Sequence, residues 1–530
     1  MRNLVRLVLL IAFSISISFN LPAQKYDRDI HKLQMAWQII TNFYVDTVNK
    51  ASVTEDAIVG MLKNLDPHSV YISADEVKAM NEPLDGSFEG IGIEFNILQD
   101  TLMVVSPIPG GPSEKVGLKS GDRIVSIDGK NVAGVGLKNS EVFKLLRGKK
   151  GTKVNLQIRR RGNLDLLAFV VIRDKIPIYS VEAAYKANAQ TGYIKISRFS
   201  STTHDEFVAA IKKLKDEKAE NLILDLRGNG GGYLKAAIEV ADELIDNKKL
   251  LVYTEGMTSP RREHHARGMG LFEKGNLVVL IDDGSASASE IVAGAVQDWD
   301  RGIVLGRRSF GKGLVQRPFS LPDGAMMRLT IAKYYTPSGR CIQKDYADGN
   351  LAYQEEIFNR YLHGEMASPD SVSQVDSLKY NTMISGRTVY GGGGIMPDIF
   401  VPVDTTMYSD YYRDIVASGI LNRFVLNYMD QNRPILVKNY KDYSSFEKRF
   451  KVTNELMSEL IAKAEEEAIH KDEEALKLSG RLLRYQIKAL IARDLWSSSE
   501  YYQAINPLME VYEKALEVVE DKHIFSQVLK

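Results

Sequence analysis

The chain has 530 residues, of which 44% are hydrophobic, so it can form several structural units and bury at least one sizeable core. Lysine plus arginine and aspartate plus glutamate both total 68, which gives a formal net charge of zero. This balance argues against a nucleic-acid-binding protein and against a polybasic membrane anchor.

Residues 1–23 have the pattern of a secretory signal peptide. Arg2 and Arg6 precede an uncharged, mostly apolar run over residues 7–19, and Ala23 follows it. We predict cleavage after Ala23 and export, with the periplasm as the destination. The alternative is an uncleaved anchor that would keep the protein on the membrane, although the run is short for a spanning helix.

Residues 24–85 carry the hydrophobic spacing of helices, with Leu33, Trp37 and Ile40 on one predicted face, and form a predicted N-terminal helical region. Residues 86–176 differ, because short runs of β-forming residues alternate with glycine and proline turns. They predict a small, mostly β unit with a helix over residues 140–146 and a strand over residues 153–159.

Apolar strands alternate with amphipathic helices from residue 193 onward. Residues 222–226 and 277–281 are near-continuous apolar runs, and each leads through a glycine-containing turn into a predicted helix. This alternation is typical of a buried sheet built from βαβ units. We assign the core to residues 177–404, with a polar, irregular excursion at residues 346–385.

Residues 405–530 are helical in pattern and rich in charge, and they predict a C-terminal helical domain or an oligomerisation arm. The predicted fold class is therefore a multidomain α+β or α/β protein. It combines a core of sheet and helices, a small β domain, and helical regions at both ends.

Cysteine and histidine usage gives little support for metal or disulfide chemistry. Cys341 is the sole cysteine, so no intrachain disulfide can form, and the eight histidines show no HExxH spacing. We expect no metal and no cofactor.

Ser287 lies at a predicted strand-to-helix junction, where the amides of a helix N-terminus favour a developing oxyanion. Ser287-x-x-Glu290 also has the spacing of a capping box, and most serines in that position simply cap a helix. The local pattern leaves both roles open.

Lys312 lies between Gly311 and Gly313, which allow close approach of the backbone. A lysine acts as a general base when burial lowers its pKa enough to make it neutral. In isolation, however, the pattern fits an ordinary surface-loop lysine better. The phosphate-loop pattern GxxxxGK[ST] is not satisfied, and no G-x-S-x-G elbow supports a Ser-His-Asp triad.

Several segments taken together resemble the C-terminal processing (tail-specific) peptidases, a family of Ser-Lys proteases. In family order they are DLRGNGGG at 225–232, GSASASEIVAGAVQD at 284–298, FGKGLVQ at 310–316, YTPSGR at 335–340 and GGGGIMPD at 391–398. Because all of these occur in order within residues 86–403, the resemblance outweighs the weak local patterns.

The resemblance implies a role for each matching residue. Ser287, the middle serine of SASAS, corresponds to the nucleophile, Lys312 to the general base, and Gln316 to the glutamine that supports the lysine. The oxyanion hole is expected to use the amide of Ala288 and a glycine amide from the turn after residue 226. Gly231 is favoured for the latter, with Gly232 as the alternative, because Gly230 departs from the family pattern.

The resemblance also identifies residues 86–176 as a PDZ domain. Gly90, Ile91, Gly92 and Ile93 resemble the loop whose amides bind a terminal carboxylate, while the substrate tail adds as a strand to the sheet edge. Arg147 matches a family arginine that couples the position of the PDZ domain to the active site. The alternative for Arg147 is a solvated residue at a helix end.

The implied function is that of an exported serine endopeptidase that binds the C-terminal tails of polypeptide substrates and cleaves through an acyl-enzyme. A homodimer and a regulatory adaptor are both compatible with the sequence. Two alternatives stay open: a catalytically silent PDZ scaffold or adaptor for periplasmic proteins, and a hydrolase of small esters with the same fold.

Overall fold

The computed structural model describes residues 27–372 and 378–530. The predicted signal peptide, residues 1–23, lies outside the described residues. The chain divides into two compact units, residues 1–65 and residues 66–530. In the described part of the chain, no helix combines the length and the apolar character needed to cross a membrane.

The first unit is a pair of helices, α2 (Arg28–Phe43) and α3 (Lys50–Leu62). Asp27 and Asn49 begin the helices, because each of these side chains accepts hydrogen bonds from two first-turn amides. The indole of Trp37 donates a hydrogen bond of 3.0 Å to the Thr54 hydroxyl, which joins the two helices.

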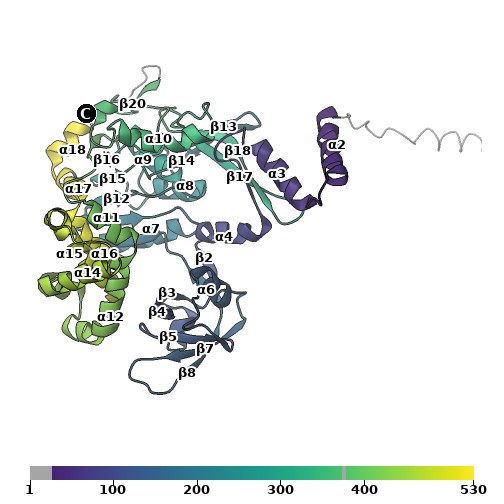
Figure 1. Cartoon of the computed structure of the whole chain (residues 1–530). Helices are drawn as coiled ribbons and strands as arrows, with labels where there is room; N and C mark the ends of the chain where they lie inside the picture. The colour runs from purple at the N-terminus through teal and green to yellow at the C-terminus, as the bar shows by residue number, and fades with distance from the viewer. Residues whose placement is uncertain (1–26, 373–377) are drawn as a thin grey trace, which may run out of the picture. The chain divides into compact units, whose positions relative to one another are not determined.

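The second unit begins with β1 (Val70–Ile72) and α4 (Ala74–Asp85), which lead into a small β domain (Figure 1). β2 (Ser87–Gly90) and β9 (Asp174–Pro177) pair antiparallel, so the two ends of this domain meet. Between them lies an antiparallel sheet in the order β3-β4-β5-β7-β8, with β6 paired to β5. These strands and the domain's helices are β3 (Ile93–Leu98), β4 (Thr101–Pro107), α5 (Pro112–Lys115), β5 (Arg123–Ile127), β6 (Lys130–Asn131), α6 (Asn139–Leu146), β7 (Lys153–Arg159) and β8 (Leu167–Ile172).

A largely parallel sheet forms the centre of the second unit. Its order is β10-β11-β12-β15-β16-β21, and neighbouring strands are parallel except for β10 and β11. β11, β15 and β16 are buried at every residue, as expected for strands covered on both faces. The strands are β10 (Val181–Lys186), β11 (Thr191–Ile196), β12 (Asn221–Asp225), β15 (Leu277–Ile281), β16 (Ile303–Gly306) and β21 (Ile399–Phe400).

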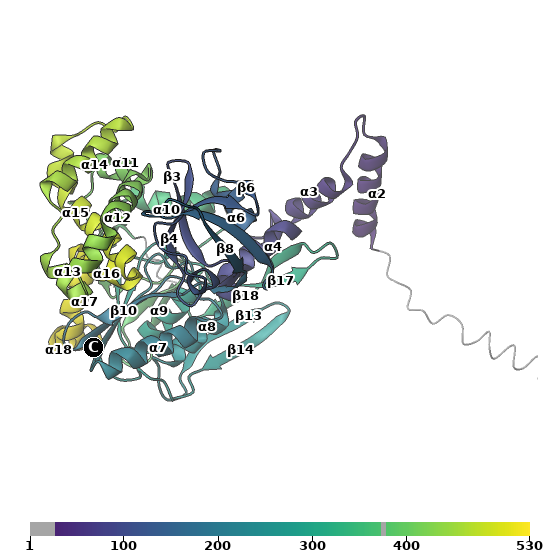
Figure 2. The same cartoon turned by 90° about the horizontal axis from the view of Figure 1, so that it is seen from below.

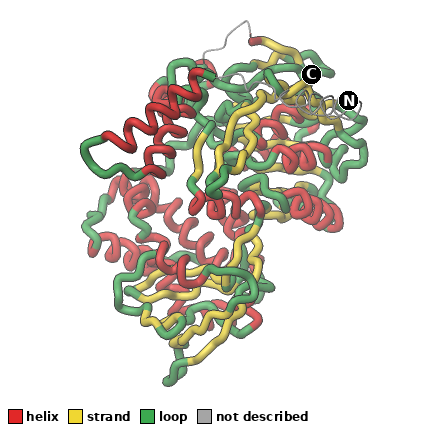
Figure 3. The backbone as a smooth tube through the Cα atoms, turned by 90° about the vertical axis from the view of Figure 1, so that its right-hand side faces the viewer, coloured by secondary structure: helices red, strands yellow, loops and turns green. Residues whose placement is uncertain are grey.

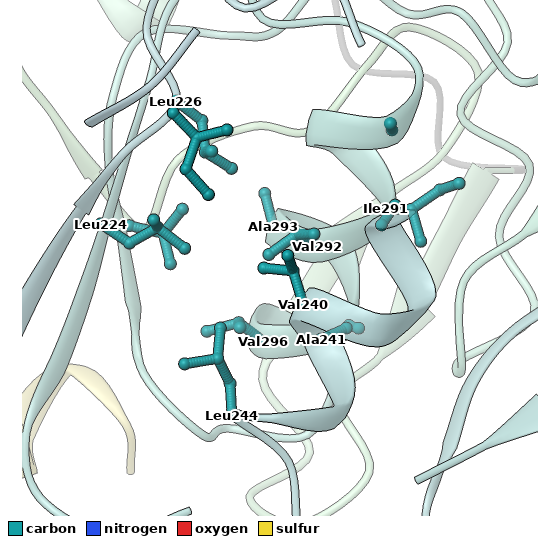
Figure 4. Close-up of a cluster of buried hydrophobic side chains, with 14 of the residues drawn as sticks. Leu224, Leu226, Val240, Ala241, Leu244, Ile291, Val292, Ala293 and Val296 are labelled. Atoms are coloured by element: carbon teal, nitrogen blue, oxygen red, sulfur yellow. The ribbon is translucent and has the colours of Figure 1, made fainter. Parts of the chain in front are cut away.

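Helices cover both faces of this parallel sheet. α7 (Thr203–Asp216), α8 (Leu234–Asp242) and α9 (Ala288–Asp298) pack on one face, and Figure 4 shows Leu224 and Leu226 opposite side chains of α8 and α9. The other face is covered by α17 (Glu510–Glu520), whose apolar residues share a buried cluster with the sheet. A segment near the C-terminus therefore completes the core.

A second sheet is antiparallel and has the order β1-β18-β13-β14, with β17 also paired to β18. Its remaining strands are β13 (Leu250–Gly256), β14 (Ser259–His265), β17 (Leu314–Ser320) and β18 (Met326–Tyr335). Residues 346–385 hold more regular structure than predicted, because Tyr353 and Arg360 bury one face of a helix. The elements there are α10 (Asn350–Leu362), the 3-10 turn Pro369–Ser371 and β19 (Lys379–Asn381), and β20 (Thr388–Tyr390) follows.

The C-terminal part of the chain is helical and forms a hydrophobic cluster of its own. Figure 3 distinguishes the helices from the strands of the sheets by colour. The helices are α11 (Asp410–Ala417), α12 (Ile420–Asn439), α13 (Tyr443–Arg449), α14 (Asn454–Glu466), α15 (Glu473–Leu495), α16 (Ser498–Ile505), the 3-10 turn Asn506–Leu508, α17 and α18 (Lys522–Val528).

Candidate active site

A cleft of about 450 Å³ brings together chain segments that are far apart in the sequence. The turn after β12, the N-terminus of α9, strands β17 and β18, and one side of α4 all contribute to its walls. All of the predicted catalytic and oxyanion-hole residues line it. They are Gly231, Gly232, Ser287, Ala288, Lys312 and Gln316.

Ser287 is the residue that immediately precedes α9, at the carboxyl end of the parallel sheet. Its backbone has φ 55° and ψ −110°, a conformation that non-glycine residues seldom adopt and that is often held at functional sites. The neighbouring serines differ from it. Ser285 and Ser289 are fully buried, and their hydroxyls donate hydrogen bonds to the carbonyls of Leu226 and Asn229, whereas Ser287 is half-buried and lines the cleft.

Lys312 reaches the same cleft from the loop before β17. Among the hydrogen bonds of the described residues, its ammonium has one partner, the Gln316 Oε1 at 3.3 Å, and the Ser287 hydroxyl is not a partner. Gln316 in turn donates through Nε2 to the main-chain carbonyl of His68. Gln316 therefore links the lysine to the loop between Leu65 and β1.

The environment of Lys312 lowers the pKa of its ammonium below the ordinary value. Burial is the main cause, because a desolvated ammonium is disfavoured, and repulsion by the positive charge of Arg328 adds to it. The carboxylates of Glu290 and Asp66 act in the opposite direction, without reversing the shift. The shift increases the fraction of lysine that is neutral and able to accept a proton.

Glu290 connects the segments of Ser287 and Lys312 through hydrogen bonds. Its carboxylate is fully buried, and one oxygen, Oε2, accepts the N–H of Ser287 at 2.7 Å and the N–H of Lys312 at 2.9 Å. The other oxygen accepts the N–H of Gly311 at 2.7 Å and the hydroxyl of Ser309 at 2.5 Å. Burial raises the pKa of Glu290, and these hydrogen bonds oppose that rise.

The glycine turn after β12 approaches Ser287 too closely for any side chain. A Cβ on Gly231 would lie 2.7 Å from the Ser287 Cβ, and one on Gly232 would lie 2.0 Å from the Phe199 carbonyl oxygen. The N–H of Gly231 donates to the Asn229 side chain at 2.9 Å. Gly232 forms a parallel bridge with Phe199, in which the N–H of Phe199 donates to the Gly231 carbonyl and the N–H of Tyr233 donates to the Phe199 carbonyl. The N–H of Gly232 therefore points away from Phe199.

The predicted PDZ residues lie apart from this cleft. Ile91 and Ile93 are buried in the core of the small β domain, and Gly92 has φ 72° in the turn between β2 and β3. Arg147, at the end of α6, forms an ion pair with Glu82 of α4 and stacks over the rings of Phe88 and Phe143.

Helix α4 joins the two regions. Glu82 binds Arg147, while its neighbours Asn81, Leu84 and Asp85 line the cleft that contains Ser287. Helix α4 therefore contacts Arg147 of the small β domain and also forms part of a wall of the cleft.

Sequence reasoning treated Glu290 as a capping residue and missed its contact with the segment of Lys312. Its spacing from Ser287 was the available signal. His68, Arg328 and Tyr334, whose hydroxyl donates to the Ser287 carbonyl at 3.1 Å, carried no local signal, because tertiary folding alone brings them to the site.

Comparison with known families matches several parts of the chain. Residues 190–351 match peptidase family S41, and residues 103–160 match the PDZ domain. Residues 17–76 match the activating protease CtpB N-terminal domain, and residues 411–497 match a family of unknown function, DUF8443.

Individual relatives agree with these matches. The chain is 37% identical over 332 residues to the carboxy-terminal processing protease CtpB of Bacillus subtilis (strain 168), which covers 62% of this chain and 68% of the relative. It is 38% identical over 357 residues to the carboxy-terminal-processing protease of Bartonella bacilliformis, with coverage of 66% and 81%. Among solved structures, the photosystem II D1 C-terminal processing protease is 31% identical, with a TM-score of 0.34, and covers 60% of this chain and 90% of that one.

A PDZ domain combined with an S41 core defines a serine-type peptidase. The chain belongs to the carboxy-terminal processing proteases of peptidase family S41. The predictions of the fold class and of the family are therefore confirmed.

Proposed function

We propose that the protein is an exported endopeptidase that cleaves polypeptides with a Ser287–Lys312 dyad after its PDZ domain has bound the substrate's C-terminal tail. The arrangement of Glu290 is the observation that carries this proposal. One buried carboxylate oxygen accepts the main-chain amides of both Ser287 and Lys312, so the two residues are held at one cleft. Their side chains face the same space, which is large enough for an extended peptide segment.

The proposed chemistry is acyl transfer. Neutral Lys312 accepts the proton of the Ser287 hydroxyl, and the Ser287 oxygen attacks the scissile carbonyl carbon. As the C–N bond breaks, the Lys312 ammonium protonates the leaving amine and becomes neutral again. A water molecule then loses a proton to Lys312 and attacks the ester carbonyl. As the C–O bond breaks, the Lys312 ammonium returns the proton to the Ser287 oxygen, which releases the new C-terminus and restores both residues. Gln316 orients the lysine through its bond to Nζ.

Backbone amides would stabilise the oxyanion. Ala288 is the first residue of α9, so its N–H belongs to the unpaired amides of a helix N-terminus. For the second donor we favour Gly232 in this arrangement, because the Gly231 amide already donates to Asn229. Gly231 can serve once that bond breaks.

Export to the periplasm rests on residues 1–23, and membrane association would follow if that segment stayed attached. A homodimer is supported by α2, where Ile30 is 65% exposed, Ile39 54% and Phe43 81%. Such side chains are usually covered in an assembly. A regulatory adaptor remains a further proposal.

Tail recognition predicts that a free C-terminal carboxylate matters for binding. For a peptide with an apolar tail, amidation of the C-terminus should weaken binding to full-length Ser287→Ala protein about 10- to 100-fold, because charge-assisted hydrogen bonds are lost. Isothermal titration of the free and amidated peptides measures this. Equal affinities would contradict tail capture by the carboxylate loop at residues 90–93.

Glu290→Gln should lower kcat strongly. Each carboxylate oxygen of Glu290 accepts two hydrogen bonds, whereas the NH2 group of a glutamine side chain is itself a donor and would face two of those donors. We expect a loss of about 10- to 100-fold in kcat together with about 1–3 kcal/mol in the free energy of unfolding. Glu290→Asp keeps the charge and should retain more activity. Wild-type kcat in Glu290→Gln would show that the carboxylate does not position the dyad.

A further inference from the structure

Helix α12 of the C-terminal region lies alongside strands β3 and β4 of the PDZ domain in two perpendicular views (Figures 1 and 2). We propose that the helical region at residues 411–497 is a dock that holds the PDZ domain of the same chain in position. This gives a function to a segment whose family match carries none.

The apolar part of the contact follows from the alternation of side chains along β4. Leu102 and Val104 point into the core of the PDZ domain, so Met103 points to the opposite face of the sheet. That face would be exposed in an isolated PDZ domain. Met103 is nevertheless 3% exposed, because it packs in a small cluster with Leu98 and with Leu426 of α12.

Charged groups surround this apolar cluster. The guanidinium of Arg123 on β5 lies 3.4 Å from the carboxylate of Asp430 on α12. Arg161, from the loop after β7, donates to the main-chain carbonyl of Asp430 at 3.0 Å. The side chains of Arg123 and Asp430 are only 26% and 16% exposed. Like charges in their place would repel each other, so such a pair determines how the two surfaces align.

The contact is incompletely packed. Crevices of about 180 Å³ and about 380 Å³ that are open to solvent lie along it, so the two surfaces meet over only part of their area. Asp494, at the end of α15, lines both crevices. Its side chain is 3% exposed, and within the described residues its Oδ2 has no hydrogen-bond partner. These features are typical of a junction that separates and re-forms.

A docked PDZ domain has a consequence for catalysis that rests on the proposed function. A tail bound to a PDZ domain at a fixed position keeps the substrate at high effective concentration near the cleft. Release of the dock lets the PDZ domain sample more positions and lowers that concentration. The dock therefore lowers KM for substrates with a free tail.

Charge reversal and rescue in the full-length protein test the dock. Hydrogen exchange of residues 101–107 and 420–434 should accelerate about fivefold or more in Asp430→Arg and in Arg123→Asp, because each places like charges together. The double variant restores an opposite-charge pair and should return to within about twofold of wild type. The matched control is Glu466→Arg, because Glu466 is exposed and pairs with Lys463 on its own helix.

A second variant, Leu426→Ala, removes the apolar contact without changing charge and should accelerate exchange of residues 101–107 as well. Thermal unfolding of each variant shows whether the fold is retained. Unchanged exchange in both Asp430→Arg and Leu426→Ala, or failure of the double variant to restore protection, would overturn the dock.

Kinetics separate the dock from the proposed function. Asp430→Arg should raise KM about three- to tenfold for a free-tail substrate and leave its kcat and the cleavage of the amidated substrate unchanged. Faster exchange with an unchanged KM would overturn the role of the dock in delivering tails. Faster exchange in a protein whose wild type cleaves neither substrate would overturn the proposed function and leave the dock standing.

Discussion

Replacing Ser287 by alanine should abolish cleavage of a denatured protein substrate, with kcat/KM at least about 10³-fold below wild type. The hydroxyl is the sole covalent attachment point in the proposed reaction, and removal of a nucleophile leaves whatever rate its binding and oxyanion groups supply. The fold should be unaffected, because Ser287 lines the cleft and the bonds to its backbone N–H and carbonyl remain. Unfolding curves and initial rates measured side by side check both parts.

The flanking serines provide the contrast. Ser285→Ala and Ser289→Ala each remove a buried hydroxyl that donates to a main-chain carbonyl, so each should cost about 1–3 kcal/mol in the free energy of unfolding. Both should still cleave. If Ser287→Ala cleaved as fast as wild type, the nucleophile would be wrong and the silent-scaffold alternative would gain support.

The second large effect concerns Lys312, whose removal should cost as much activity as the loss of Ser287. Lys312→Ala lacks a base, and Lys312→Arg keeps a positive charge that cannot be removed near neutral pH. Both should fall at least about 10³-fold in kcat/KM. Substantial activity in Lys312→Arg would show that the group need not deprotonate, and would contradict the general-base role.

The pH profile of the wild type follows from the same group. In the proposed mechanism the neutral form of Lys312 is the active one, so kcat should rise with pH and level off above the pKa of the lysine. Because burial and Arg328 lower that pKa, the midpoint should lie below the ordinary lysine value of 10.5.

Substitution of Arg328 tests whether its charge contributes to the lowered pKa of Lys312. Arg328→Gln removes a positive charge, so the pKa of Lys312 should rise and the kcat midpoint should move to higher pH. Arg328→Lys keeps the charge and should leave the midpoint near that of wild type. Since Arg328 lines the cleft, a change in KM alone carries no information here, whereas a midpoint that moves to lower pH would contradict the electrostatic argument.

Local sequence patterns were sufficient for much of the fold. The helix predicted over residues 140–146 corresponds to α6, and the strand over residues 153–159 corresponds to β7. The structure of the excursion at residues 346–385 was harder to predict from the sequence. Its regularity depends on Tyr353 and Arg360 reaching partners in the core. Several apolar residues of α10, including Leu351, Phe358 and Leu362, are exposed, so the apolar pattern does not mark the buried face.

Some features of the candidate site could likewise be predicted from the sequence, and others could not. The order and spacing of the motifs around Ser287 and Lys312 were visible in the chain, because the turns that present them are short and rich in glycine. Glu290 was visible too, but its link to Lys312 was not. That link joins α9 to the loop before β17, and no periodic pattern in the sequence indicates a contact between separate elements.

Motif order and turn chemistry are local properties, so the family, the kind of domains and the residues expected to react could be predicted from the chain. Which groups contact one another depended on the tertiary fold. It brought the buried carboxylate of Glu290 within hydrogen-bond distance of the Ser287 and Lys312 amides and set Arg328 near Lys312. It also joined Arg147 to α4 and packed α12 against the PDZ domain. Burial, charge proximity and packing depend on residues distant in the chain, and the pKa of Lys312 depends on all three.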